Sequence, residues 1–304
     1  MARKALVLSG GSIKGAFQAG AVAHVLEHGF APDAIYGTSV GSLNGGFVAD
    51  RVGRSDPPIN WGNIGRELEE FWRQRITEFH RVGRSRGIVS LLFSLKAGRF
   101  DGFLDMSRLH DLVHDVISAK NIQRATVDFY ACAVDLATGM AVYADRNYDS
   151  ILDYIIASTS IPLLMPITAI GSELLWDGGI REVAPLRRAI KSGADEIVCI
   201  ACDAKDLGGA AIPGRKAPFL LLAGRLMEMV TNETLNNDIG TCNDTNTYIR
   251  ECANPTGLLK SRTAVTLTVI RPHNQLNIDL ERFTPEDIAN MLQLGRTVAA
   301  GVWP

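Results

Sequence analysis

Three short glycine motifs, each following an apolar run, constrain this chain more than any other feature of its sequence. They are Gly10-Gly11-Ser12-Ile13-Lys14-Gly15, Gly37-Thr38-Ser39-Val40-Gly41 and Asp177-Gly178-Gly179. The middle motif has the form of a nucleophile elbow, in which a serine lies on a tight turn between a strand and a helix. Because this turn is too crowded for side chains two residues on either side of the serine, glycines are needed there. The motif predicts Ser39 as a nucleophile, with Gly37 and Gly41 as the glycines of the elbow.

The other two motifs supply the groups that an activated serine needs. The first is a run of backbone N–H groups at the start of a helix, which is suited to stabilising a negatively charged oxygen. We expect an oxyanion hole built from residues of this motif, namely Gly10, Gly11, Ser12, Lys14 and Gly15. The third motif places a carboxylate on a glycine-flanked turn. A carboxylate is a weak base toward an alcohol unless it is partly desolvated and hydrogen-bonded directly to it, as we expect for Asp177 and Ser39.

The first motif also suggests two kinds of nucleotide site, and both fail on specific residues. In a phosphate-binding Walker loop, Ala16 and Phe17 stand where lysine and serine or threonine are required. As a dinucleotide-binding fingerprint, the motif has Ser12 in place of its middle glycine, and the next strand ends without an acidic residue for a ribose. The role of Lys14 stays open between fixing the loop, attracting an anionic substrate and lying in solvent.

A histidine is the usual base for a catalytic serine, and one of the six histidines is placed for that role. His273 follows the last predicted strand, where the histidine of a conventional Ser-His-Asp esterase or thioesterase would lie. It competes with Asp177, and the sequence leaves both open. His110 and His114 are one helical turn apart, and an exposed polar face explains them better than a metal site does.

Composition restricts the class of protein and its partners. The 304 residues are 46% hydrophobic and 21% charged, which is typical of a globular enzyme with a large core. A net charge of −2 gives no general basis for binding nucleic acid. The five cysteines lack metal-ligand pairing and favour a reducing compartment, and Cys199 and Cys202 lie in an apolar run, as buried strand thiols do. Since no apolar stretch is long enough for a signal peptide or a membrane span, we expect a cytoplasmic protein.

Hydrophobic periodicity predicts alternating strands and helices along most of the chain. Strands are expected at residues 4–8, 34–36, 127–134, 140–144, 173–176, 196–202 and 264–270. Helices are expected at residues 15–27, 40–50, 65–76, 149–157, 185–191, 219–235 and 284–300. Strand, helix, strand and helix within the first fifty residues indicate an α/β protein whose parallel sheet has helices on its faces.

The ordered trio of motifs resembles the patatin-like phospholipase family, with further likeness in residues 157–166 and in the turn at residues 135–139. The resemblance covers roughly residues 4–203. It implies a single domain over residues 1–304, with a three-layer α/β/α fold and a mostly parallel central sheet. Around this core we expect a helical cap at about residues 55–120 and a helical extension at about residues 204–304.

The resemblance also implies a mechanism. It implies a Ser39–Asp177 dyad without histidine, no metal or organic cofactor, and fatty-acyl esters of phospholipids or related lipids as substrates. Two positions depart from the family pattern, because Ser12 replaces a glycine and Lys14 stands where arginine is commoner. The backbone N–H donors survive both changes, although lysine loses any bidentate contact that arginine makes. A catalytically inactive lipid-binding module with the same fold remains an alternative.

Residues 71–100 are unusually basic for this chain. They contain seven lysine or arginine residues and one glutamate, a net charge of +6, and they include an apolar run at residues 87–95. We expect a lid that contacts anionic membrane and admits a lipid. A buried helix with solvated arginines around it is an equally good interpretation.

Overall fold

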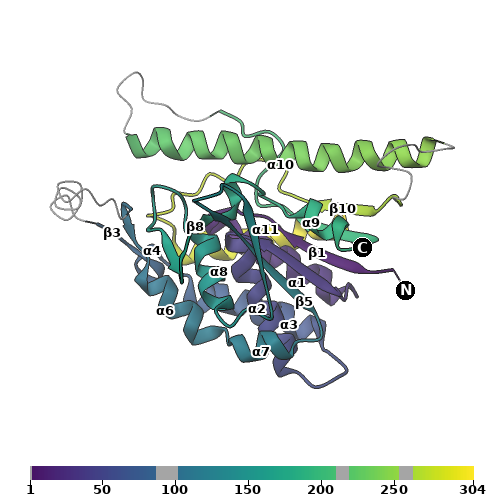
Figure 1. Ribbon diagram of the computed structural model, residues 1–304, viewed down its shortest axis with the longest axis horizontal. Coiled ribbons are helices and arrows are strands. Elements are labelled where there is room, and N and C mark those ends of the chain that lie inside the picture. The colour runs from purple at the N-terminus through teal and green to yellow at the C-terminus, as the bar shows by residue number, and fades with distance from the viewer. Residues whose placement is uncertain (1, 87–101, 210–218, 253–262) are drawn as a thin grey trace.

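A mostly parallel sheet forms the centre of the molecule (Figure 1). The structure is a computed structural model that describes residues 2–86, 102–209, 219–252 and 263–304. Within these residues the sheet has eight strands in the order β10-β9-β1-β2-β5-β8-β7, and β6 also pairs with β5. The five strands from β10 to β5 are parallel, whereas β6, β7 and β8 pair antiparallel. The strands are β1 (Lys4–Leu8), β2 (Ala34–Thr38), β5 (Asp128–Asp135), β6 (Ala141–Asp145), β7 (Thr168–Ile170), β8 (Glu173–Asp177), β9 (Glu196–Ile200) and β10 (Thr266–Ile270).

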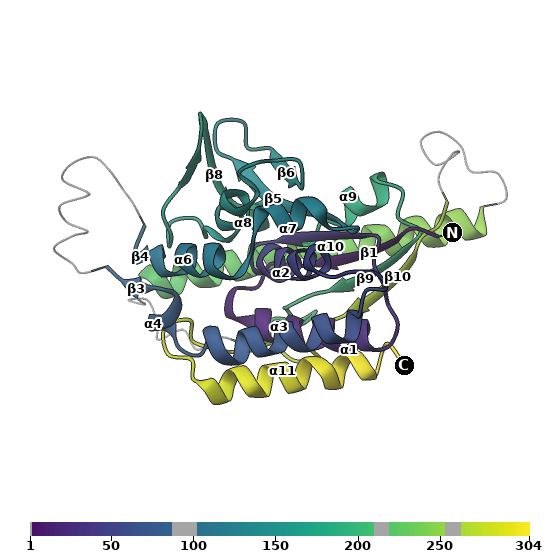
Figure 2. The same ribbon diagram turned by 90° about the horizontal axis from the view of Figure 1, so that it is seen from below.

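Helices cover both faces of this sheet, which gives three layers. Figure 2 shows α1, α3 and α11 side by side in one layer, and α2 packs with them against the sheet. Figure 1 shows the long helix α10 on the opposite side, where it packs with α9. The first layer contains α1 (Gly15–Glu27), α2 (Val40–Arg54), α3 (Trp61–Arg75) and α11 (Pro285–Ala300), while α7 (Ala119–Arg124) and α8 (Ile151–Thr159) pack on α2. The second contains α9 (Leu186–Lys191) and α10 (Phe219–Glu251).

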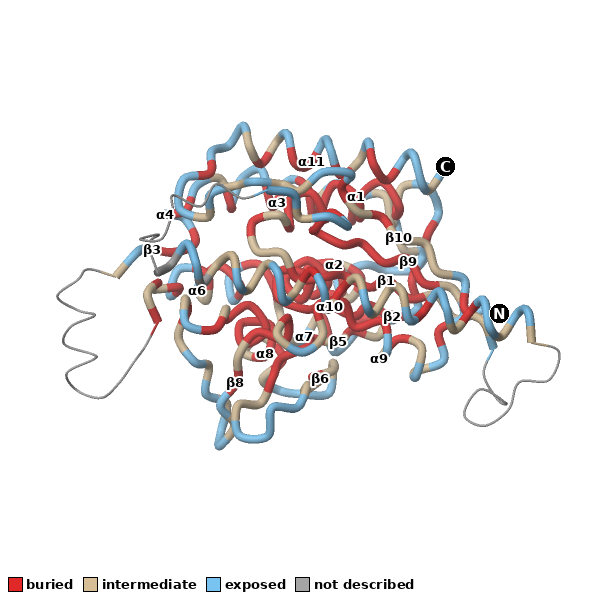
Figure 3. The backbone as a smooth tube through the Cα atoms, turned by 90° about the horizontal axis from the view of Figure 1, so that it is seen from above, coloured by how far each residue is buried: buried red, intermediate tan, exposed pale blue. Residues whose placement is uncertain are grey.

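The alternation of side chains along β1 explains why both faces are covered. Leu6 and Leu8 belong to the larger apolar core beneath α1 and α2, whereas Ala5 and Val7 belong to a smaller core beneath α9 and α10. All four are fully buried, as expected for a central parallel strand that is apolar throughout. Figure 3 shows that the buried part of the backbone is concentrated in these central strands and the helices against them. The predicted three-layer α/β/α class is confirmed.

The prediction of a helix at residues 219–235 is wrong at its end, because α10 continues to Glu251. Its second half is polar and contains Gly240, so local propensity gives little reason for a helix there. Burial supplies the reason. Leu235, Cys242 and Asn246 lie on one face of the helix and are buried, and the Asn246 side chain accepts a hydrogen bond from the Val265 N–H at 2.9 Å.

The segment predicted as a cap is made of different parts. Helix α3 packs along α1 as a member of the first layer. Beyond it lie α4 (Phe79–Val82), the short strands β3 (Arg84–Ser85) and β4 (Leu104–Asp105), and α6 (Ser107–Val116). The apolar run proposed as a lid falls in residues 87–101, outside the described residues, and two flanking arginines form ion pairs, Arg75 with Asp115 and Arg84 with Asp105. Contact with an anionic membrane therefore stays a prediction. Among the described residues, no helix combines the length and apolar character needed to cross a bilayer.

Candidate active site

Ser39 occupies the sharp turn between β2 and α2. Its φ of 55° and ψ of −128° are a strained conformation for a residue with a side chain. A Cβ atom on Gly37 would lie 2.4 Å from the Gly41 carbonyl oxygen, and one on Gly41 would lie 2.2 Å from the Leu8 carbonyl oxygen. Such distances are far below van der Waals contact, so the turn requires glycine at both positions. This geometry holds Ser39 at the carboxyl end of β2, with its side chain at the start of α2.

The sheet brings Asp177 to the same place. Asp177 is the last residue of β8 and pairs with Ala133 of β5, while the neighbouring residue Cys132 pairs with Thr38 of β2. Asp177 therefore lies across β5 from Ser39, close enough for the Ser39 hydroxyl to lower the pKa of the Asp177 carboxyl group. Both residues are nearly buried, with exposed fractions of 5% for Asp177 and 6% for Ser39.

Burial dominates the electrostatics of Asp177. It raises the pKa of this carboxyl group from 3.8 to about 6, because the low-dielectric surroundings disfavour the charged form. The Ser39 side chain and the hydrogen bond from the Gly179 N–H, which is 2.7 Å from Oδ1, both lower the pKa but do not cancel this rise. The result is a carboxylate that ionises near neutral pH close to a hydroxyl group. That combination is what a general base needs.

One segment supports both side chains, and sequence reasoning did not identify its role. The Ser158 hydroxyl accepts a hydrogen bond from the Ser39 N–H at 2.8 Å, while the Asp177 N–H donates to the Ser160 carbonyl at 3.0 Å. Ser158 also donates to the Cys132 carbonyl and bonds to the Ser42 hydroxyl at 2.8 Å. The end of α8 thus ties the elbow to the turn after β8. The signal in the sequence was the run Ser158-Thr159-Ser160 at the end of an apolar helix.

The first glycine motif lies directly against Ser39, but only part of it is free to bind an anion. A Cβ atom on Gly10 would lie 3.2 Å from the Ser39 Cβ. The Gly10 N–H is not available, because it donates to the Val183 carbonyl at 2.9 Å. The N–H groups of Lys14 and Gly15 are used within the short helix η1 (Ser12–Lys14) and its end. In the described part of the chain, the Gly11 and Ser12 N–H groups have no hydrogen-bond partner.

The open question about Lys14 has a structural answer. Its ammonium group forms an ion pair with Asp203, and both side chains are close to fully buried, with exposed fractions of 12% and 9%. It therefore fixes the loop and is not a free cation for substrate. Ser12, two residues earlier, has a φ of 53°, in the left-handed region that favours the glycine usual at this position.

A chain of buried polar side chains lies behind the loop. Gln18 donates from Nε2 to the carbonyl oxygens of Ser9 and Ile200, at 3.0 and 3.1 Å. Asn44 donates to Gln18 Oε1 at 3.0 Å and accepts from the Trp72 indole N–H at 2.8 Å. These bonds connect α1, α2 and α3 to the loop. No motif in the sequence indicated them.

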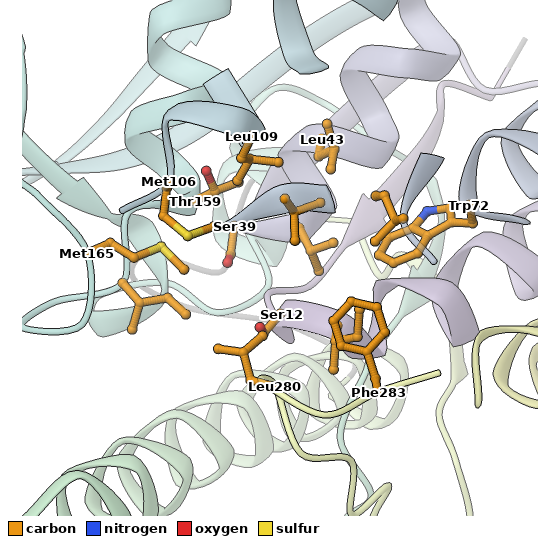
Figure 4. Close-up of a pocket in the computed structure, with 15 residues that line it drawn as sticks. Ser12, Ser39, Leu43, Trp72, Met106, Leu109, Thr159, Met165, Leu280 and Phe283 are labelled. Atoms are coloured by element: carbon orange, nitrogen blue, oxygen red, sulfur yellow. The ribbon is translucent and has the colours of Figure 1, made fainter. Parts of the chain in front are cut away.

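An apolar pocket, partly open to solvent, is lined by Ser39. Figure 4 shows Met106 and Met165 on one side of Ser39 and Trp72 and Phe283 on the other. Ser12, Ser39 and Thr159 are its only polar lining residues in the part of the chain that the structure describes. The apolar lining comes from Ile13, Val40, Leu43, Trp72, Ile76, Val82, Met106, Leu109, Ile161, Met165, Leu280 and Phe283. A nucleophile in the wall of such a pocket is positioned for a ligand with a hydrocarbon chain.

The remaining candidates lie away from this pocket. His273 is exposed and is not among the residues that line it. Cys199 and Cys202 are fully buried, and burial raises the pKa of both thiols to about 12, as expected of inert strand residues. Among the described residues, including His110 and His114, no cluster of three or more histidine, cysteine or acidic side chains is arranged to hold a metal ion.

Comparison with known proteins gives relatives of several kinds. An uncharacterised NTE family protein of Mycobacterium bovis is 28% identical over 241 residues, which cover 78% of this chain and 58% of the relative. Patatin-like phospholipase domain-containing protein 7 of the mouse is 25% identical over 66% of this chain and 14% of its own length. Lysophospholipase NTE1 of Candida albicans is 25% identical over 64% of this chain and 13% of its own length. The chain thus spans little more than half of the bacterial relative and a small part of the other two.

Two further comparisons concern the fold and the family. A crystal structure of VipD from Legionella pneumophila aligns with 99% of this chain and 66% of its own, with a TM-score of 0.40 and 11% identity. The sequence profile of the family described as patatin-like phospholipase matches residues 6–190, more than half of the chain. That stretch contains the glycine loop, the serine elbow and the Asp-Gly-Gly turn, and on this basis the chain belongs to the patatin-like phospholipase family.

Proposed function

We propose that this protein is a serine lipid acyl hydrolase, which cleaves fatty-acyl esters of phospholipids or related lipids through a Ser39–Asp177 dyad. The observation that carries the proposal is a buried carboxylate close to a strained serine that lines an apolar pocket. Family membership agrees with it, and two of the relatives described above carry the names lysophospholipase and phospholipase.

In the first half of the reaction, Ser39 Oγ attacks the carbonyl carbon of the ester while Asp177 accepts the hydroxyl proton. The Gly179 N–H donates to Oδ1 of this carboxylate and holds it in place. The negative charge that forms on the carbonyl oxygen is held by the N–H groups of Gly11 and Ser12. When the tetrahedral intermediate collapses, the ester C–O bond breaks and the proton passes from Asp177 to the leaving alcohol. The acyl group remains on Ser39.

In the second half, water attacks the acyl-enzyme with Asp177 again as the base. The fatty acid leaves, and Ser39 recovers its proton. No step requires a histidine, which is consistent with the exposed position of His273 outside the pocket. The acyl chain lies in the apolar pocket, where each buried methylene group contributes about 0.8 kcal/mol to binding.

The proposal is tested by assaying hydrolysis of a phospholipid, a lysophospholipid, a neutral lipid and an acyl thioester. We expect at least one ester to be cleaved by the parent protein, and Ser39→Ala and Asp177→Asn to abolish cleavage. His273→Ala should leave activity unchanged, whereas a Ser-His-Asp enzyme would lose it. Below about pH 6, kcat/KM should fall about tenfold per pH unit, because Asp177 is then protonated.

Covalent labelling with a fluorophosphonate provides an assay that does not depend on the choice of lipid. An activated Ser39 should react, and Ser39→Ala should not. Absence of both labelling and hydrolysis in the folded parent protein would identify an inactive lipid-binding module and overturn the proposal.

A further inference from the structure

The glycine loop is enclosed between Ser39 and the turn that follows β9. On one side, a Cβ atom on Gly10 would lie 3.2 Å from the Ser39 Cβ. On the other side, a Cβ atom on Gly11 would lie 2.2 Å from the Cys202 Cβ, so the backbone of the loop packs directly on this turn. The Cys202 N–H also donates to the Ser9 hydroxyl at 2.9 Å. Any shift of the turn after β9 would therefore move the loop relative to Ser39.

The far end of the loop is attached to the same turn by the ion pair between Lys14 and Asp203. Because both side chains are nearly buried, solvent screens this attraction weakly, and losing one partner would leave a buried charge unpaired. Between the two attachment points at Gly11 and Lys14 lies Ser12, in the left-handed conformation that a serine adopts only under constraint. The ion pair anchors the loop at Lys14, two residues after Ser12.

Residues far along the chain hold Asp203 itself. Gln275 donates from Nε2 to Asp203 Oδ1 at 2.7 Å and accepts from the Ala204 N–H at 3.1 Å. Arg271 donates from Nε to the Asp203 carbonyl at 2.9 Å. Asn232 of α10 donates to the Ala204 carbonyl at 2.8 Å. Asp203 thus has a fixed position, set by α10 and by the segment after β10, all of it beyond the family match at residues 6–190.

We infer that Asp203 is a positioning residue of the active site, which acts through Lys14 and with the help of Gln275. It keeps the Gly11 and Ser12 N–H groups directed at the carbonyl oxygen that reacts with Ser39. This inference rests on the proposed function and adds to it a residue outside the three motifs. An arginine at position 14 would make the same contact, since it too reaches a carboxylate.

The test compares steady-state kinetics of Asp203→Asn and Lys14→Met with those of the parent protein, on the lipid found to be the best substrate. We expect kcat to fall about 100-fold in both, because small displacements of oxyanion donors have effects of that size. KM should change less than threefold, because the apolar pocket is untouched. Fluorophosphonate labelling of Ser39 should slow in parallel. Lys14→Arg should recover at least a third of the parent kcat.

Arg296→Met is the matched control, since it removes another partly buried cation from its ion pairs with Glu27 and Glu69. Arg296 does not line the pocket, so this variant should lower the melting temperature and leave kcat unchanged. If Asp203→Asn fails to fold, Gln275→Leu leaves the ion pair intact and should lower kcat about tenfold.

Two outcomes separate this inference from the proposed function. An active parent protein with kcat of Asp203→Asn, or of Gln275→Leu, no lower than that of Arg296→Met would overturn the positioning role alone. A folded parent protein that neither cleaves any lipid nor reacts with fluorophosphonate would overturn the proposed function, and the inference with it.

Discussion

At the scale of single residues, burial of the ionisable carboxyl group of Asp177 lowers the stability of the fold. A buried carboxylate with its pKa raised to about 6 is costly to keep ionised at neutral pH. The unfolded chain ionises this group at its ordinary pKa of 3.8, so the native state loses stability as the pH rises from that value through about 6. Above about pH 6 the penalty is constant, and below about pH 4 it is absent.

Asp177→Asn should therefore stabilise the fold while it abolishes activity. The amide keeps an acceptor for the Gly179 N–H and carries no charge. From the pKa shift we expect the free energy of unfolding at pH 8 to increase by about 3 kcal/mol, and by about half of that at pH 5. Urea denaturation at the two pH values measures this, with the exposed Asp149→Asn as a control that should change little. A variant less stable than the parent protein at pH 8 would contradict the effect of burial on Asp177.

At this scale the sequence carries the constraints that lie within one motif, but it does not reveal constraints that depend on residues far along the chain. The glycines at positions 37 and 41 were identified because the turn excludes any side chain, a constraint contained within five residues. The N–H of Gly10 was expected to face an oxyanion, yet its acceptor is Val183, which no local pattern could associate with it. The sequence leaves the role of Lys14 open for the same reason, because its ion-pair partner Asp203 follows strand β9, 189 residues further along the chain.

At the scale of elements, the end of α8 is the structural link between the two candidate catalytic residues. Ser158→Ala should remove the acceptor of the Ser39 N–H and a partner of the Ser42 hydroxyl. A buried N–H left without a partner costs about 1–3 kcal/mol, and we expect that loss in the free energy of unfolding. Because the elbow is then less constrained, kcat should also fall about tenfold.

Ser55→Ala is the control for this experiment. It removes an exposed hydroxyl whose hydrogen bond goes to the Arg51 carbonyl at 2.8 Å, at the other end of α2. We expect its stability to change by less than about 0.5 kcal/mol and its kcat to stay the same. Equal effects of the two substitutions on kcat would remove Ser158 from any supporting role.

Elements with a strong apolar period were predicted well, whereas those held by tertiary contacts were not. The strand at residues 4–8 and the helix at residues 15–27 match β1 and α1, because apolar runs bounded by glycine are complete local signals. Helix α10 was predicted to end at residue 235, since its polar second half has no such signal. Helix α10 continues to Glu251 because its second half packs on the second face of the sheet. No short stretch of the sequence shows that this packing occurs.

At the scale of the whole molecule, the pocket is assembled from parts of the chain that are distant in sequence. Ser39 and Val40 come from the first fifty residues, Met106 and Leu109 from the predicted cap, and Phe283 from the segment before α11. The family match ends at residue 190, so part of the pocket wall is supplied by a region that the match does not cover. The three motifs predict a nucleophile at Ser39, but no motif predicts the shape of this pocket wall.

That region should therefore set the acyl-chain preference of the proposed hydrolase. Phe283 is 4% exposed and lines the pocket, so Phe283→Leu enlarges the space for a chain without introducing a polar group. We expect the best substrate in a series of saturated acyl esters to become longer by about two methylene groups. Each added methylene should raise kcat/KM about fourfold, because its burial contributes about 0.8 kcal/mol.

The matched control is Phe30→Leu, since Phe30 is fully buried against Trp303 and does not line the pocket. It should lower the melting temperature and leave the chain-length profile unchanged, whereas an unchanged profile in Phe283→Leu would show that this wall does not contact the acyl chain.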